Sequence, residues 1–160
     1  MASRRKGRIL AFQALYAWDV RYSQSGETGI PEELLDFSWT LKVAEFKDAA
    51  TKDKVLNEKN TAFPRLLFCG TVENIGVVYS MIQKHLENWE IKRLNRVDLA
   101  VLRMSVYTLM FQNSMPPSVV IDEAVDISRE FGTDDSYRFV NGVLDAVRKT
   151  LMAEENEKSF

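Results

Sequence analysis

The stretch that most constrains the fold is VDLAVLRMSVYTLMF, residues 97–111, which carries apolar side chains nearly all round a helical wheel. A helix of this kind needs other helices on every side, because it has no polar face to turn toward water. We therefore expect it to be the central helix of a larger helical fold.

Apolar residues recur at helical spacing along much of the remaining chain, and no stretch alternates polar and apolar residues as a half-buried strand does. The chain of 160 residues is long enough for one compact domain with a real apolar core. The fold class predicted from these patterns is all-α, with six or seven helices. The expected helices cover residues 3–22, a segment starting at Pro31, 63–89 and 97–111. A further helix is expected between the break at 113–117 and Gly132, and the last helix begins at 133–135 and has a buried stripe of Val140, Val143, Leu144, Val147 and Leu151.

Prolines and glycines mark the expected helix boundaries. Pro64 is expected near the start of the helix over 63–89, and Gly132 is expected to end a helix as a left-handed cap. The polar stretch 42–60 predicts a short helix at best, and the final residues, EENEKSF, are expected to fray.

Positive charge is concentrated at the start of the chain. Residues 1–18 carry four cations and no acid, although the whole chain has a formal net charge of −2. A helix N-terminus disfavours cations by roughly 0.3–1 kcal/mol each, so stability does not require this cluster. An anionic ligand such as a phosphate chain would explain the cluster of cations. The plainer alternative is that the cations only keep the N-terminus soluble. The cluster consists of Arg4, Arg5, Lys6 and Arg8.

A second candidate surface lies in EFGTDDSYRFVNGVLDAV, residues 130–147. Phe139 falls at the flank of the expected buried stripe and Arg138 on its far side. An aromatic ring beside a cation can stack on an unpaired base and neutralise its phosphate. The alternative is that the aromatic residues only widen the core face, and Asp134 or Asp135 is explained as a helix N-cap.

The residues that could perform catalysis or bind a metal are few, and no catalytic or metal site is expected. A single histidine, His85, cannot form a multi-histidine zinc site, and Cys69 is expected to pack in the core. Asp122, Glu123 and Asp126 could attract a cation but are better explained as a solvated face. With one cysteine and no export signal or long apolar span, the sequence predicts a soluble, cytoplasmic protein.

Three segments together resemble the bacterial transcription antitermination factor NusB family: RRKGRILAFQALYAWDV, NRVDLAVLRMSVYTLMF and VIDEAVDISREFGTDDSYRFVNGVLDAV. The resemblance covers roughly residues 3–22 and 63–150. It implies one helical domain over residues 1–160, built as two small bundles that share a core. The N-terminal sub-bundle would cover about 3–89, and the C-terminal sub-bundle about 91–152.

The resemblance also implies a function without enzymatic activity or cofactor. Members of the family bind the single-stranded boxA element of ribosomal RNA transcripts, usually together with the small-subunit ribosomal protein that serves as NusE. The pair joins the RNA polymerase elongation complex with other Nus factors. Some relatives self-associate, so a homodimer is a further expectation.

Specific residues follow from the same resemblance, position by position. The partner-binding positions would be Tyr16 and Asp98. The RNA-binding positions would be Arg4, Arg5, Lys6, Arg8, Asp135, Arg138 and Phe139.

The connection over residues 23–62 departs from the family pattern, because it is long and rich in Lys, Glu and Asp. Two other functions remain open at this point. The chain could be an RNA-binding module like the one found in certain ribosomal RNA cytosine methyltransferases, or a helical protein-interaction scaffold without RNA affinity.

Overall fold

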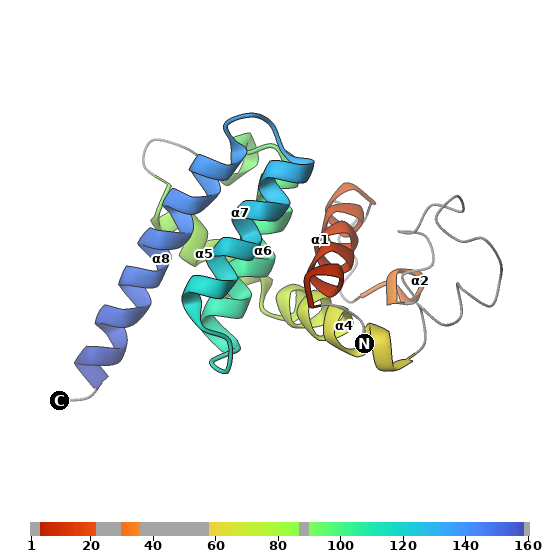
Figure 1. Cartoon of the computed structure of the whole chain (residues 1–160), viewed down its shortest axis with the longest axis horizontal. Coiled ribbons are helices and arrows are strands. Elements are labelled where there is room, and N and C mark those ends of the chain that lie inside the picture. Colours follow the sequence, from red (N-terminus) through yellow and green to blue (C-terminus); the bar gives the residue numbers. More distant parts are fainter. Residues whose placement is uncertain (1–3, 22–29, 36–57, 87–89, 159–160) are drawn as a thin grey trace. The chain divides into compact units, whose positions relative to one another are not determined.

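A computed structural model describes residues 4–21, 30–35, 58–86 and 90–158. These residues contain seven α-helices and one short 3-10 helix, with no strand among them, which confirms the all-α prediction. The chain divides into two compact units, Met1–Glu73 (unit 1) and Asn74–Phe160 (unit 2), shown in red to yellow and in green to blue in Figure 1. The sub-bundles expected over about 3–89 and 91–152 remain a prediction.

Unit 1 is built on the packing of α1 (Arg4–Arg21) against α4 (Glu58–Glu73). The buried face of α1 combines Phe12 and Leu15 with small residues such as Ala11 and Ala14, which let the neighbouring backbone approach closely. The helix predicted over residues 3–22 is therefore confirmed, and its buried face is richer in alanine than the large apolar residues alone suggested.

A short helix follows the helix start predicted at Pro31. The helix α2 (Glu32–Leu35) contacts α1, and the amide of Leu34 donates a hydrogen bond to the carbonyl of Pro31. Leu34 is 1% exposed, and Arg65 of α4 donates a hydrogen bond to the carbonyl of Leu35. These contacts attach α2 to the rest of unit 1.

In unit 2, α6 (Arg96–Phe111) packs against α5 (Ile75–Lys84), α7 (Pro117–Phe131) and α8 (Ser136–Lys158). Every residue of α6 from Asp98 to Thr108 is buried. This confirms the prediction of a central helix surrounded by others. The stripe predicted on α8 is also buried at Val140, Val143, Leu144 and Val147.

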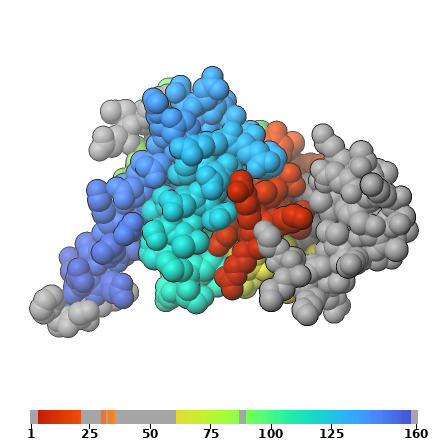
Figure 2. All heavy atoms as spheres, viewed as in Figure 1, coloured from red at the N-terminus to blue at the C-terminus, as the bar shows by residue number. Residues whose placement is uncertain are grey.

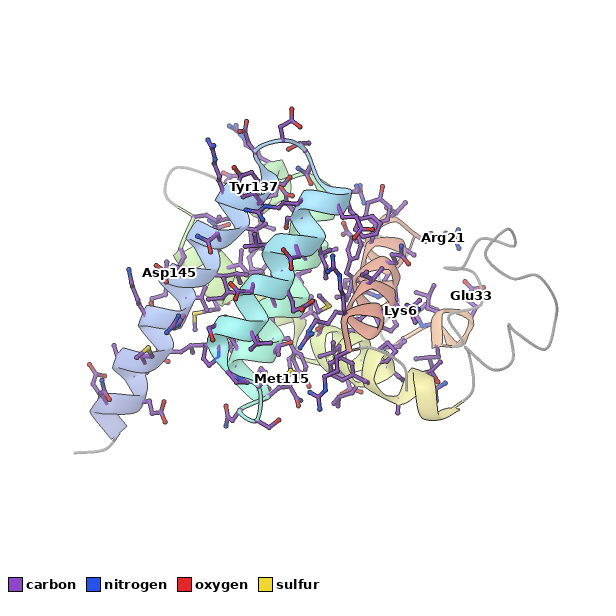
Figure 3. The ribbon with its side chains drawn as sticks, viewed as in Figure 1. Lys6, Arg21, Glu33, Met115, Tyr137 and Asp145 are labelled. Carbon is purple, nitrogen blue, oxygen red and sulfur yellow. The ribbon has the colours of Figure 1, made fainter. Side chains whose placement is uncertain are left out.

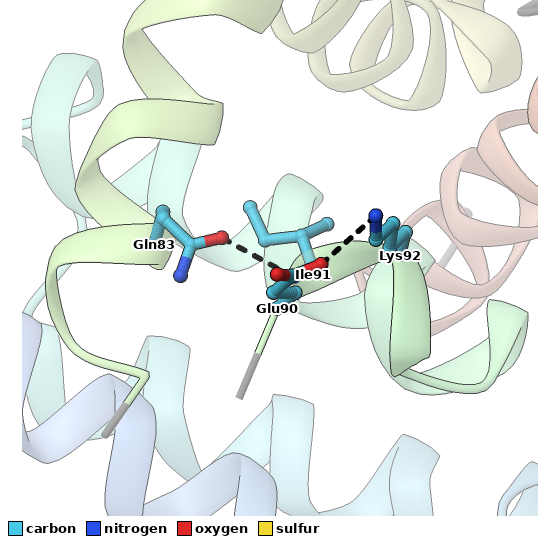
Figure 4. Close-up of polar contacts among 4 residues, drawn as sticks. All are labelled: Gln83, Glu90, Ile91 and Lys92. Atoms are coloured by element: carbon cyan, nitrogen blue, oxygen red, sulfur yellow. Dashed lines mark hydrogen bonds and ion pairs between the residues drawn. The ribbon is translucent and has the colours of Figure 1, made fainter. Parts of the chain in front are cut away.

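A 3-10 helix, η2 (Ile91–Arg93), lies beside the end of α5 and precedes α6. The amide of Ile91 donates a hydrogen bond of 3.2 Å to Oε1 of Gln83, and Ile91 itself is 3% exposed (Figure 4). Lys92 forms a 3.0 Å ion pair with Glu90, but both side chains are well exposed, so this pair adds little stability. The buried isoleucine and its amide therefore hold η2 against α5.

The prediction of one helix over 63–89 with Pro64 at its start is wrong. Two helices, α4 and α5, are separated at Asn74, whose φ of −111° and ψ of 23° lie outside helical values. Pro64 lies inside α4, because the helix already begins at Glu58 in the polar stretch 42–60. Glutamate and lysine are good helix formers, so a polar sequence can supply the first turns.

Two expectations near α8 are also corrected. Gly132 ends α7 in an extended conformation, with φ −93° and ψ −166°, and not as a left-handed cap. The helix α8 continues to Lys158, through most of the segment expected to fray. Four of residues 154–158 are Glu or Lys, and both residue types have high helix propensity.

Among the described helices, none is by itself long and apolar enough to cross a membrane. Residues of α4 and α5 reach the required length and hydropathy only when the two helices are counted together across the break at Asn74.

Candidate nucleic-acid interface

The basic cluster lies in the first turns of α1, where no acidic residue is present. Arg4, Arg5 and Lys6 are exposed, whereas Arg8 is only 6% exposed. Lys6 is labelled on this helix in Figure 3. The cations therefore divide into an exposed group at the helix start and one buried guanidinium a turn further along.

Two of these cations lie over the same aromatic ring of α4. The guanidinium carbons of Arg4 and Arg8 lie 5.3 and 5.6 Å from the ring centroid of Phe63. Gly7 lies between them in sequence, and a Cβ built there would be 2.7 Å from Cδ1 of Phe63. The glycine thus lets the ring approach the backbone of α1. These contacts hold the start of α1 against α4, and they define how the exposed cations are presented.

The second cluster lies at the start of α8. Arg138 is exposed, and its Nε donates a 2.9 Å hydrogen bond to the hydroxyl of Tyr137. The guanidinium of Arg129, from α7, lies 4.7 Å from the centroid of the same ring. Asp135 is exposed just before the helix, and Phe139 is half-buried in its first turn. Figure 3 shows Tyr137 at this end of α8.

Arg129 was not among the residues predicted from the sequence. It precedes Tyr137 by eight residues and belongs to another helix, so only the turn between α7 and α8 brings the two together. The sequence signal that could have identified it is a cation close to the end of one helix, followed by an aromatic residue at the start of the next.

The turn that places Tyr137 and Arg138 is closed by Thr133 and Ser136. The hydroxyl of Ser136 accepts a 2.9 Å hydrogen bond from the amide of Thr133, and the two hydroxyls are 3.0 Å apart. Thr133 and Ser136 make these side-chain hydrogen bonds of the turn, and capping of α8 by Asp134 or Asp135 stays a prediction. The carboxylate of Asp135 is left at the surface.

The two residues predicted to bind a protein partner differ in exposure. Tyr16 on α1 is 40% exposed. Asp98 is 6% exposed at the start of α6, where its amide donates to Asn95 Oδ1 and its Oδ2 accepts from Asn95 Nδ2. Its other oxygen, Oδ1, is buried without a hydrogen-bond partner in the described structure. A carboxylate here also suits the positive end of the helix dipole.

The histidine and the cysteine both occupy partly buried positions. His85 ends α5, and its Nε2 is 3.0 Å from the hydroxyl of Thr150 in α8. Burial lowers the pKa of His85, and the charge of Lys84 lowers it further. Cys69 is half-buried rather than fully packed in the core. Burial is the main reason that the pKa of its thiol is raised, which favours the unreactive protonated form.

Acidic residues do not converge on a metal site in the part of the chain that the structure describes. No group of three or more His, Cys, Asp or Glu side chains there is placed to hold an ion. Asp122 is exposed, while Glu123 and Asp126 are half-buried along α7.

In both clusters, arginine guanidinium groups lie over an aromatic ring. Arg4 and Arg8 at the start of α1 lie over Phe63, and Arg129 and Arg138 lie over Tyr137 at the start of α8. Cations neutralise phosphates, and aromatic rings stack on bases that are not paired. The described part of the chain is therefore all-helical and carries two surfaces with the cations and aromatic rings that suit contact with nucleic acid.

Comparison with known proteins identifies the family. Residues 5–149 match the model of the NusB family, so the chain belongs to that family. It is 46% identical over 145 residues to the transcription antitermination protein NusB of Treponema denticola, covering 91% of this chain and 95% of the relative. It is 47% identical over 147 residues to the protein of the same name from Treponema pallidum, covering 92% and 93%.

Comparison with solved structures points to the same family as the comparison of sequences. The fold is similar to that of T. maritima NusB, with a TM-score of 0.73, 32% identity and 93% coverage of each chain. It is also similar to a chain in a crystal structure of the antitermination factors NusB and NusE in complex with dsRNA. For that chain the TM-score is 0.70 and the identity 31%, over 92% of this chain and 96% of the other.

Proposed function

We propose that this chain is an RNA-binding transcription antitermination factor that acts in ribosomal RNA transcription with a NusE-type ribosomal protein. Its family membership and the printed function of its Treponema relatives support the general role. The structural neighbour that contains NusE and dsRNA supports RNA and NusE as partners. In this role the protein works in the bacterial cytoplasm, beside RNA polymerase and the other Nus factors.

The observation that carries the RNA-binding proposal is the arrangement at the start of α8. Tyr137 holds the Arg138 side chain through its hydroxyl and has the Arg129 guanidinium close to its ring. A side chain that is already held loses less entropy when it binds a phosphate. Half-buried Phe139 lies next in sequence and offers a ring to an unpaired base. Asp135 would contribute a carboxylate acceptor for base or ribose donors.

The start of α1 would supply the electrostatic part of binding. Arg4, Arg5 and Lys6 are exposed at a helix N-terminus, where backbone amides also favour anions. Arg8 is buried against Phe63, so we assign it a positioning function in which it fixes the helix start that presents the other three. Direct contact of Arg8 with RNA remains a prediction.

The protein partner would be contacted through α1 and the start of α6. Exposed Tyr16 offers an aromatic surface of the kind that is enriched in interfaces. Asp98 is buried and bonded to Asn95, so we propose that it shapes the start of α6 next to the partner rather than reaching out to it.

We further propose that the chain performs no catalysis and needs no cofactor. The raised pKa of Cys69 and the single, structurally bonded His85 offer no activated nucleophile or base among the described residues. Two alternatives remain: an RNA-binding module like that of ribosomal RNA cytosine methyltransferases, and a protein-interaction scaffold without RNA affinity.

Binding to defined RNAs tests the proposal. Fluorescence anisotropy would compare a boxA-like single strand, a scrambled single strand and a duplex, each with and without the ribosomal protein. We expect the boxA-like strand to bind best, and the added partner to increase that preference. Equal binding of all three RNAs under both conditions would contradict the boxA proposal, and no binding at all would favour the scaffold.

Substitutions at α8 locate the site. Replacing Phe139 by alanine removes a stack worth about 1–3 kcal/mol per base, which corresponds to roughly a 5- to 150-fold loss of affinity. Arg138→Ala should weaken binding by a smaller factor. The matched control is Lys149→Ala, an exposed cation of the same helix that pairs with Asp145. The assignment fails if Lys149→Ala weakens binding as much as Arg138→Ala, provided that both variants unfold at the wild-type urea concentration.

A further inference from the structure

Two arginines from different helices meet at the ring of Tyr137. The guanidinium carbon of Arg129, near the end of α7, lies 4.7 Å from the ring centroid, and that of Arg138 lies 5.5 Å from it. Both arginines are exposed, and the tyrosine is half-buried. The turn between α7 and α8 lies at the molecular surface, in mid-blue at the top of Figure 2. Two positive charges are therefore held close together where a ligand can reach them.

These two charges have no acidic partner in the described part of the chain. Neither arginine forms an ion pair there, although Asp134 and Asp135 lie in the turn that joins α7 to α8. By contrast, Lys149 further along α8 pairs with Asp145 at 3.1 Å. Like charges that are held together repel each other unless a counter-charge lies near both. The arrangement therefore favours an anion as its ligand.

The ring of Tyr137 positions the arginines for a phosphate. Arg129 lies over the ring at stacking distance, so it occupies a place where a base could otherwise stack. A stacked guanidinium keeps the N–H groups at its edge free, and its planar fork matches two oxygens of a phosphate. The Nε of Arg138 donates to the tyrosine hydroxyl, which leaves the two terminal nitrogens of that side chain for an anion. Phe139 remains the stacking ring of this surface.

The turn between the helices fixes where the two arginines start. Ser136 is 1% exposed, and its hydroxyl accepts a 2.9 Å hydrogen bond from the amide of Thr133. A Cβ at Gly132 would be 2.6 Å from Cβ of Ser136, so a larger residue does not fit without a shift of the chain. Such close packing holds the end of α7 against the start of α8. Cations that are held in place before binding lose less entropy than mobile ones when an anion binds.

We propose that Arg129 and Arg138 together bind one backbone phosphate of a single-stranded RNA, and that Tyr137 is the residue that positions both guanidinium groups. This inference rests on the proposed RNA-binding function and adds Arg129, which is not among the positions implied by the family resemblance. A phosphate is the same in every nucleotide, so the site holds the strand in place without reading a base. Loss of the site should therefore weaken the binding of boxA-like and scrambled strands by the same factor.

Fluorescence anisotropy of the full chain with both strands tests the shared phosphate. Arg129→Ala and Arg138→Ala should each weaken binding about fivefold. The double variant should lose clearly less than the product of the two single losses, because one arginine alone no longer fixes the phosphate. Its slope of log K against log salt concentration should be shallower by about 0.7, the value for one phosphate. Lys149→Ala, an exposed cation of α8 that already has a partner, is the matched control and should change neither quantity.

Substitutions of Tyr137 test its positioning function. Tyr137→Phe removes the hydrogen bond to Arg138 and keeps the ring, whereas Tyr137→Leu removes both. We expect affinity to fall from the wild type to Tyr137→Phe and further to Tyr137→Leu. The salt slope of Tyr137→Leu should also become shallower, although both arginines are still present. Wild-type affinity and slope in Tyr137→Leu would contradict the positioning function, whatever the variant does to the urea midpoint.

The remaining outcomes overturn the shared phosphate site. Wild-type affinity in Arg129→Ala shows that this residue does not touch the strand. Multiplicative losses with a slope change of about 1.4 show two separate phosphates. A variant that changes the ratio of boxA-like to scrambled affinity shows that its residue reads a base. If Phe139→Ala weakens binding and Arg129→Ala does not, the RNA-binding function stands and only this inference fails, whereas a wild-type chain that binds neither strand overturns both.

Discussion

Gly132 lies at the turn that connects α7 to α8 and places Tyr137 and Arg138. A Cβ at this position would be 2.6 Å from Cβ of Ser136 and 2.7 Å from the backbone oxygen of Ser128. Backbone cannot move aside as a flexible side chain can, so Gly132→Ala should lower the free energy of unfolding by about 1–3 kcal/mol. Urea denaturation measures this change.

The matched control is Gly142→Ala, because no atom lies within 4 Å of a Cβ built at that helical position. There alanine should stabilise α8 by about 0.5–1 kcal/mol. Equal effects of the two substitutions would contradict the close approach at Gly132.

His85 gives unit 2 a pH-dependent stability. Its folded-state pKa is lowered by burial and by Lys84, so the folded state favours the neutral ring. Between the folded pKa and the ordinary value near 6.5, the unfolded state binds more protons, and stability therefore rises with pH. The stability that the neutral His85 ring contributes is fully present above about pH 6.5, and it is lost as the pH falls through the folded-state pKa.

Urea denaturation between pH 5 and 8 checks this expectation. In His85→Gln the free energy of unfolding should fall less on acidification than in the wild type, because the titrating ring is gone. The same dependence in both proteins would show that carboxylates alone set the acid sensitivity.

The helices α1 and α4 are joined at Phe63 of α4, because the guanidinium groups of Arg4 and Arg8 in α1 lie over its ring. Phe63→Leu keeps much of the apolar volume but removes two cation–π contacts, one worth about 0.5–1 kcal/mol at exposed Arg4 and one worth about 2 kcal/mol at buried Arg8. We expect a loss of about 2–3 kcal/mol in the free energy of unfolding. Weaker RNA binding should accompany it, because the basic start of α1 is then less ordered.

The control for this substitution is Leu66→Ala, which changes a 46% exposed residue of the same helix. A control that lowers stability and RNA binding as much as Phe63→Leu would show that the contacts with the arginines have no special effect. Thermal unfolding and anisotropy measure the two quantities.

Hydrophobic periodicity predicted the helices whose burial is strongest. The central α6 followed from its uninterrupted apolar surface, and the buried stripe of α8 from its regular spacing. The break at Asn74 was missed because the apolar pattern continues on both sides of it, and backbone angles at one residue leave no mark on that pattern. Contacts between helices, such as that of Arg129 with Tyr137, depend on the turn geometry, which hydrophobic periodicity does not report.

For the molecule as a whole, the separation of charge has a direct functional consequence. The chain has a net charge of −2, yet residues 1–18 carry four cations and no acidic residue. A surplus of acids elsewhere disfavours unspecific attachment of RNA to the other surfaces. At the proposed site we expect RNA binding to depend on a few phosphate contacts together with base stacking and a protein partner, and therefore to be sensitive to salt.

The salt dependence of RNA affinity tests the central claim most directly. Each phosphate neutralised on a single strand contributes about −0.7 to the slope of log K against log salt concentration. The triple variant Arg4→Ala, Arg5→Ala, Lys6→Ala should therefore bind a boxA-like strand with a slope shallower by about 2. Arg21→Ala, an exposed cation at the other end of α1, should leave the slope unchanged. A triple variant with the wild-type slope would contradict the assignment of RNA binding to the start of α1.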